Sequence, residues 1–295
     1  MRIDDTFLWT VVFIGYPSDE PNKGGIDCIG TAFLLRHEGF PYLVTVRHLA
    51  EHVGSDPFLL RVNLTGGGAE NLHVDNAAWY YDSDPTVDAA VSPLHEIFEE
   101  DKYAVQFIDD EKESWWSNKA RKYGVGIGDF CYTIGLFRVL SGREQNLPVV
   151  HFGTIARRIF GHEVEPIPIK DWRDPRDQKT ILTNAYLIES QSLSGLSGAP
   201  VFVRVSNHHV SDDLIKSNPT VPPGQMGDAV AMWHLHLIGI WQGAWDAPPA
   251  EVFGVERGRG IGVPVGMGVV VPIDYVHYIL AKDELRAMRG VGKKS

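Results

Sequence analysis

A serine on a glycine-flanked turn is the first candidate for chemistry in this chain. Ser197 lies in the run GLSGAP (residues 195–200), and Gly195 can adopt backbone angles that are closed to other residues. On a tight turn of this kind the amides of Gly195 and Ser197 converge on one point, where they would bind a developing oxyanion. The run therefore predicts a nucleophilic serine, and an ordinary turn rich in Gly, Ser and Pro is the alternative.

A serine hydroxyl needs a neighbouring imidazole as its base, and the imidazole needs a carboxylate to orient it. His48 follows the apolar, β-branched run YLVTVR (42–47), which predicts a strand that ends at the histidine. With the run GTAFLL (30–35), this strand makes a plausible hairpin. Asp88 stands inside the small apolar run VDAAV (87–91), and a carboxylate in that context is expected to be buried with a partner.

Through these three motifs, in the order His, Asp, Ser, the chain resembles the chymotrypsin-like serine proteases, the PA clan, in their disulfide-free bacterial forms. The resemblance implies an all-β fold of two six-stranded antiparallel β-barrels with a C-terminal helix. Residues 1–120 would then form the N-terminal barrel with His48 and Asp88, and residues 121–295 the C-terminal barrel with Ser197. Subtilisin-like enzymes and α/β-hydrolases order these residues differently, which excludes both.

Other histidines and aspartates compete for the same roles. Among the histidines, only His48 ends an apolar strand in the context of the family. Asp82 and Asp84 lie in a polar turn and are expected to be turn residues. The competing histidines are His37, His52 and His73.

Strand-like runs recur along the chain, and helical periodicity is nearly absent before residue 274. The segment 274–285 predicts a C-terminal helix with Asp274 as its N-cap. A linker is expected at residues 114–128, and polar insertions at 161–179, 206–232 and 247–264. The expected strands are 7–14, 30–35, 57–64, 104–108, 130–136, 149–155, 182–188, 237–243 and 266–273.

Only the family resemblance predicts which residues determine substrate specificity. It implies a pocket with Gln191 at its floor and with Gln242, Gly243 and Gly268 as its walls. None of the four is acidic, so we expect no strong preference for cleavage after Lys or Arg. The insertions would rim the cleft.

Composition restricts the partners. The formal net charge of −11 argues against nucleic acid, whose phosphates require a Lys and Arg surface. No apolar stretch of about 18 residues is present, and no signal segment is visible at the start, so we expect no membrane and a cytoplasmic location. Cys28 and Cys131 are the only cysteines and are expected to be buried thiols without a disulfide. No metal or other cofactor is expected.

The sequence thus predicts a serine endopeptidase that works through an acyl-enzyme on a polypeptide substrate. Leu196 precedes Ser197 where zymogen-activated members of the family carry an aspartate, so we expect no activation by N-terminal cleavage. A narrow substrate range or a regulatory protein partner would then restrain the enzyme. Two alternatives stay open: a catalytically silent or partner-gated binding module, and an esterase, because the same chemistry serves esters.

Overall fold

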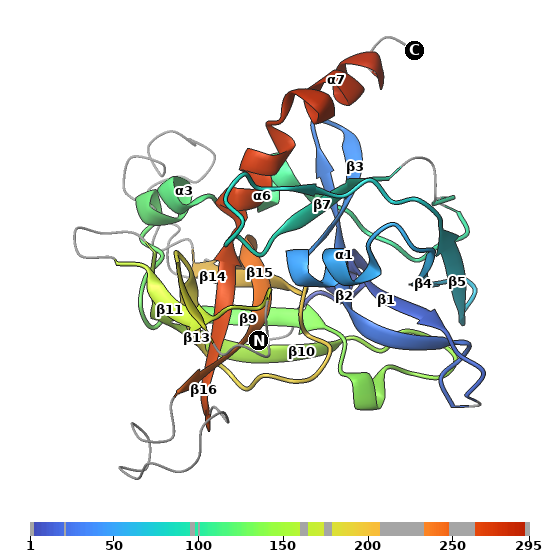
Figure 1. The fold of residues 1–295 in the computed structure, drawn as a ribbon, viewed down its shortest axis with the longest axis horizontal. Helices are drawn as coiled ribbons and strands as arrows, with labels where there is room; N and C mark the ends of the chain where they lie inside the picture. The colour runs from blue at the N-terminus through green and yellow to red at the C-terminus, as the bar shows by residue number, and fades with distance from the viewer. Residues whose placement is uncertain are drawn as a thin grey trace, which may run out of the picture.

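The computed structural model describes residues 3–20, 22–94, 98–99, 101–159, 165–173, 179–206, 233–247 and 263–292. The chain is mostly β, with one open sheet, one closed barrel and helices at the C-terminal end (Figure 1). Both thiols are buried and unpaired, as expected. No helix in these ranges is long and apolar enough to cross a membrane.

The N-terminal strands form an open eight-stranded sheet rather than the predicted closed barrel. Its order is β5-β4-β1-β2-β3-β7-β6, with β8 parallel to β2, and its end strands β5 and β6 do not pair. β6 has only two residues and β7 four, too few to carry hydrogen bonds round to β5. The strands are β1 (Val11–Pro17), β2 (Ile26–His37), β3 (Phe40–Thr45), β4 (Phe58–Asn63), β5 (Ala69–Val74), β6 (Tyr80–Tyr81), β7 (Ala90–Pro93) and β8 (Ile108–Asp109).

The strands from β9 onward close into a barrel of order β10-β13-β16-β15-β14-β9. Its strands are β9 (Phe130–Gly135), β10 (Val149–Arg157), β13 (Tyr186–Glu189), β14 (Pro200–Ser206), β15 (Trp233–Ala247) and β16 (Val263–Pro272). Between β10 and β13 a separate hairpin, β11 (Ile167–Lys170) with β12 (Thr180–Thr183), stands off the barrel. The predicted strand 182–188 is therefore two strands that belong to different sheets. The predicted division at residue 120 stays a prediction.

The hairpin between β2 and β3 forms as expected, because Glu38 and Gly39 have φ values of 50° and 81° and close a two-residue turn. Two other strand predictions are wrong in part. Residues Asp5–Thr10 form the 3₁₀ helix η1, and of 104–108 only the last residue is in a strand. The remaining short helices are α1 (Arg47–Val53), α2 (Asp110–Glu113), α3 (Ser117–Lys122) and η2 (Arg138–Leu140); α2 and α3 lie in or beside the expected linker.

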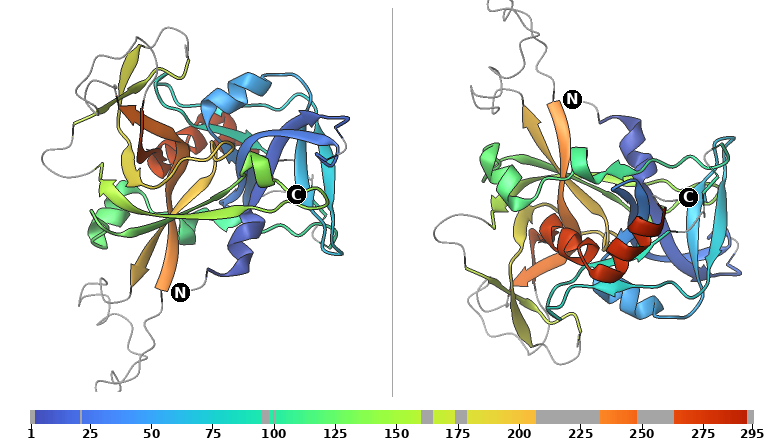
Figure 2. Two further views of the ribbon diagram at one scale, coloured as in Figure 1. Left: turned by 90° about the horizontal axis from the view of Figure 1, so that it is seen from below. Right: turned by 90° about the horizontal axis from the view of Figure 1, so that it is seen from above.

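The C-terminal helix is interrupted. α6 (Ile273–Leu280) and α7 (Asp283–Gly292) follow β16 and lie across the junction of the two sheets (Figure 2). α6 packs against β7 of the open sheet and against β15 and β16 of the barrel. Asp274 is not the N-cap of α6, which is Pro272; its carboxylate instead accepts hydrogen bonds from the Ser117 amide and hydroxyl.

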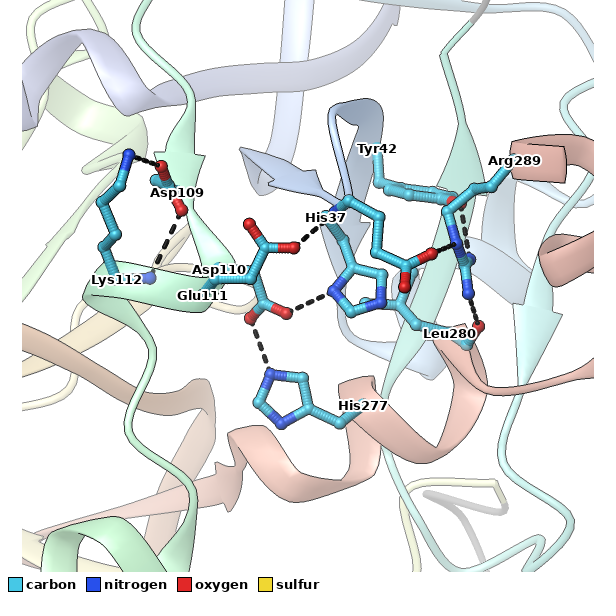
Figure 3. A network of polar contacts seen from close by, with 10 residues as sticks. His37, Tyr42, Asp109, Asp110, Glu111, Lys112, His277, Leu280 and Arg289 are labelled. Atoms are coloured by element: carbon cyan, nitrogen blue, oxygen red, sulfur yellow. Dashed lines mark hydrogen bonds and ion pairs between the residues drawn. The ribbon is translucent and has the colours of Figure 1, made fainter. Parts of the chain in front are cut away.

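A buried carboxylate ties these parts together (Figure 3). Asp110, at the start of α2, contacts His37 Nδ1 of β2 and His277 Nε2 of α6, each at 2.6 Å. Close by, Arg289 of α7 donates to Glu38 and to the Tyr42 hydroxyl. The hydrophobic core is shared in the same way, since Phe33 and Leu34 of the open sheet belong to one buried cluster with barrel residues such as Phe202, Leu237 and Ile240. The two sheets are thereby held against each other.

Candidate active site

His48 does not end a strand as the sequence predicts. β3 stops at Thr45, and His48 lies in the first turn of α1. The N-cap residue of this helix, Val46, provides no side-chain cap, so the first amides of α1 need another acceptor. Asp88 is that acceptor for the His48 amide, which donates to Oδ1 at 2.8 Å. The aspartate therefore orients the helix start as well as the ring.

The second oxygen of Asp88 holds the imidazole, with His48 Nδ1 at 2.8 Å from Oδ2. The Asp88 side chain is fully buried, and the His48 side chain is 31% exposed. With Nδ1 occupied by the carboxylate, Nε2 is the ring nitrogen left for a substrate or a nucleophile. Burial by itself lowers the pKa of His48, but the charge of Asp88 and its hydrogen bond outweigh burial and raise this pKa above its usual value.

Ser197 lies on a turn that only glycine permits on both sides. Gly195 and Gly198 have φ values of 103° and 87°. A Cβ on Gly198 would lie 2.0 Å from the Thr31 carbonyl oxygen, and a Cβ on Gly195 would lie 2.8 Å from the Leu136 side chain. The two glycines therefore satisfy both the backbone angles of the turn and its close packing.

Two carbonyl groups fix the orientation of the peptides in this turn. The Ser194 carbonyl accepts from the Arg138 amide at 3.0 Å, and the Leu196 carbonyl accepts from the Ala199 amide at 2.8 Å. In a trans peptide the N–H points away from the preceding carbonyl, so the amides of Gly195 and Ser197 point away from these partners. Within the described ranges neither amide has an acceptor, whereas those of Leu196, Gly198 and Ala199 do. Both N–H groups are therefore available as donors on the same turn as the Ser197 hydroxyl.

Thr31 of β2 holds the serine turn against the open sheet, a role that the sequence reasoning missed. Its amide donates to the Ser197 carbonyl at 3.0 Å, and its hydroxyl donates to the Gly195 carbonyl at 2.8 Å. Gly30 lies between the Ser197 carbonyl and the side chain of Leu49, the residue after His48. Elements far apart in the sequence therefore bring the serine turn beside the start of α1. A threonine within a motif already singled out, GTAF, was the available signal.

The Ser197 hydroxyl donates to the Gln242 carbonyl of β15 at 3.1 Å rather than to His48. No other hydrogen bond of this hydroxyl occurs within the described ranges. For a proton to pass to the imidazole, the hydroxyl must rotate away from Gln242.

The predicted pocket residues do not share one environment. Gln191 is exposed, Gln242 and Gly243 are half-buried, and Gly268 is buried. The ring of Trp241 packs directly on Gly268, since a Cβ there would lie 1.9 Å from the indole. Trp241 thus occupies the space that a side chain at position 268 would take. The role of these four residues in a substrate pocket stays a prediction.

The competing side chains have other partners or surroundings. His37 contacts Asp110, and His52 and His73 are exposed. Asp84 accepts from the Thr86 amide and hydroxyl in a turn, as expected. No group of three or more His, Cys, Asp or Glu side chains in the described ranges is arranged to hold a metal ion.

One insertion contributes a side chain that the sequence reasoning did not name. Trp172, just beyond β11, lies with its ring centroid 6.2 Å from that of His48. Of the expected insertions, 207–232 and 248–262 lie outside the described residues, as do 161–164 and 174–178 of the first.

Comparison with known proteins gives a structural likeness alone. No protein-family model and no curated protein matches this sequence. Among solved structures, the chain is similar to Rv3671c protease in its inactive form, with a TM-score of 0.45 and 14% identity over 93% of this chain and 89% of that one.

Proposed function

We propose that this protein is a serine endopeptidase in which Ser197 is the nucleophile, His48 the general base and Asp88 the residue that orients the imidazole. The observation that carries the proposal is the pair of amides at Gly195 and Ser197 that have no acceptor among the described residues. They lie beside a hydroxyl, in a turn that Gly30 brings close to Leu49, the neighbour of the Asp88-bound His48.

In the proposed reaction the Ser197 oxygen attacks the substrate carbonyl carbon while its proton passes to His48 Nε2. The amides of Gly195 and Ser197 bind the negative oxygen. The carbon–nitrogen bond then breaks, the proton moves from His48 to the leaving amine, and an acyl group stays on Ser197. Water, deprotonated by His48, releases the acyl group in the same way. Asp88 stabilises the imidazolium in both steps and is not itself protonated.

A polypeptide substrate is favoured over a simple ester by the edge of β15. β14 pairs with β15 only as far as Ile240, whereas β16 continues to pair through Ala247. Among the described residues, the opposite edge of Gly243–Trp245 has no strand partner. An extended peptide can add to such an edge through main-chain hydrogen bonds. The Ser197 hydroxyl contacts Gln242, which lies at the start of this edge.

The proposal includes the finer features implied by the family resemblance. Residues 1–120 would form one unit and 121–295 the other. Gln191, Gln242, Gly243 and Gly268 would bound the substrate pocket. A regulatory protein partner would restrain the enzyme, which would act in the cytoplasm.

The hydrogen bond from Ser197 to Gln242 favours a second candidate, a silent or partner-gated binding module. In that case the hydroxyl stays on the carbonyl, and the same edge of β15 holds a peptide without cleaving it.

Labelling with a fluorophosphonate probe, measured by intact mass, tests the two candidates. We expect the wild type to gain one adduct and Ser197→Ala to gain none. Loss of the base in His48→Ala should slow labelling by about 10²-fold or more. Ser194→Ala is the matched control, because this exposed serine lies on the same loop. An unlabelled wild type, or a labelled Ser197→Ala, would contradict the enzyme proposal.

A further inference from the structure

The β11–β12 hairpin brings a tryptophan against the candidate catalytic histidine. Trp172 lies just beyond β11, and the Asp171 amide donates to the Lys179 carbonyl at 2.8 Å across the hairpin. The indole and the His48 imidazole are 6.2 Å apart between centroids and inclined at 46°. Nothing in the proposed chemistry requires this ring, because Asp88 alone orients the imidazole.

The indole is held in place from both sheets. On the barrel side it packs, with Trp245 of β15, against a small buried cluster that includes Ile169 and Val269. Trp245 is itself tied to the hairpin, since its Nε1 donates to the Pro168 carbonyl at 2.9 Å. The Trp172 indole is therefore packed in place and is not a freely moving surface side chain.

On the side of the open sheet, Arg47 of α1 supports the same ring. Its guanidinium lies 5.9 Å from the Trp172 ring and 4.7 Å from the Tyr81 ring. Arg47 is also paired with Glu51 at 2.7 Å. Cation–π contacts of this type are stabilising, so moving the indole would break favourable contacts on both sides.

We propose that Trp172 limits the size of the substrate side chain that lies over His48, so that only a small residue such as Gly, Ala or Ser fits at that position. This inference rests on the proposed function. A peptide on the free edge of β15 runs beside Trp245, and Trp245 shares its apolar cluster with Trp172. The indole lies close beside the imidazole, so a substrate side chain that lies over His48 on the way to Ser197 meets the indole. The contact with Arg47 helps to hold the indole in this position.

Peptide selection on an inactive background tests this size limit without depending on catalysis. Ser197→Ala binds peptides without cutting them, and a displayed random peptide library is selected on it and on Ser197→Ala/Trp172→Ala. We expect Ser197→Ala to enrich small residues at one position. Removal of the indole should raise the frequency of Leu, Phe and Met at that position at least about 10-fold, as removal of a steric wall does. Trp172→Phe, which keeps an aromatic ring, should retain most of the restriction.

Trp9→Ala, added to Ser197→Ala, is the control for loss of a tryptophan, because Trp9 lies on η1 and is 44% exposed. It should leave the selected sequences unchanged. The inference is overturned if the double variant selects the same residues as Ser197→Ala, if preferences change equally at all positions, or if Ser197→Ala binds no peptide.

The two proposals fail separately. If the wild type is not labelled by fluorophosphonate but peptide selection still depends on Trp172, the proposed enzyme activity is wrong and the size limit set by Trp172 stands. If the wild type is labelled but peptide selection does not depend on Trp172, the size limit is wrong and the proposed enzyme activity stands.

Discussion

Replacement of Gly198 by alanine should strongly destabilise the serine turn. Gly198 has a φ of 87°, and its added Cβ would lie 2.0 Å from the Thr31 carbonyl oxygen and 2.2 Å from the Thr45 hydroxyl oxygen. Neither oxygen is free to recede. The Thr31 amide donates to the Ser197 carbonyl at 3.0 Å, and the Thr45 hydroxyl donates to the Thr31 carbonyl at 2.8 Å.

Two effects add at this position. A non-glycine residue in a sparsely populated backbone region costs about 1–3 kcal/mol. Forcing an extra carbon into a well-packed site costs about 1–3 kcal/mol more. We therefore expect Gly198→Ala to lower the free energy of unfolding by about 2–6 kcal/mol, or to displace the turn and abolish labelling of Ser197.

Two other glycines separate the effects. Gly39 has a φ of 81° with nothing near its Cβ position, so Gly39→Ala carries only the backbone cost, about 1–2 kcal/mol. Gly66 has neither a positive φ nor a neighbour, and Gly66→Ala should be close to neutral. Urea denaturation followed by tryptophan fluorescence gives the three values. If Gly198→Ala unfolds at the same urea concentration as Gly39→Ala and still reacts with the probe, the packing argument is wrong.

Two further predictions concern protons. Because Asp88 raises the pKa of His48, the labelling rate should fall as the pH drops through a midpoint above 6.5. Asp88→Asn should shift this midpoint to lower pH. If the midpoint does not move, the pH dependence of labelling does not come from the His48–Asp88 pair. The stability that this pair contributes is present below pH 6.5 and is lost as the pH rises through the higher folded pKa of His48. Burial raises the pKa of Asp110, but hydrogen bonds with His277 and His37 outweigh burial and hold it well below its usual range. The stability that Asp110 contributes is thus present above pH 3.8 and is lost on acidification. Asp110→Asn should lower the free energy of unfolding at neutral pH by about 3–5 kcal/mol, measured by urea denaturation. If acidification destabilised the wild type less than it destabilises the variant, this prediction would be contradicted.

Local motifs determined much of what the sequence alone predicted. The glycines around Ser197 indicated a tight turn because positive φ values are a local property of the backbone. The apolar surroundings of Asp88 indicated burial with a partner, and the structure places it beside His48. Most strands were predicted for the same reason, since β-branched and apolar runs favour extended backbone wherever they occur.

Only the tertiary structure decided the rest. The open edge of the N-terminal sheet depends on whether β5 and β6 meet, which no local pattern records. Asp274 was expected to cap a helix and instead binds Ser117, a residue 157 positions away. The roles of Thr31 and Trp172 likewise come from contacts between distant segments. A side chain's type and spacing determine which conformations and partners are favourable, but which distant partner it meets is settled by how the two sheets pack, because burial selects among many locally equivalent arrangements.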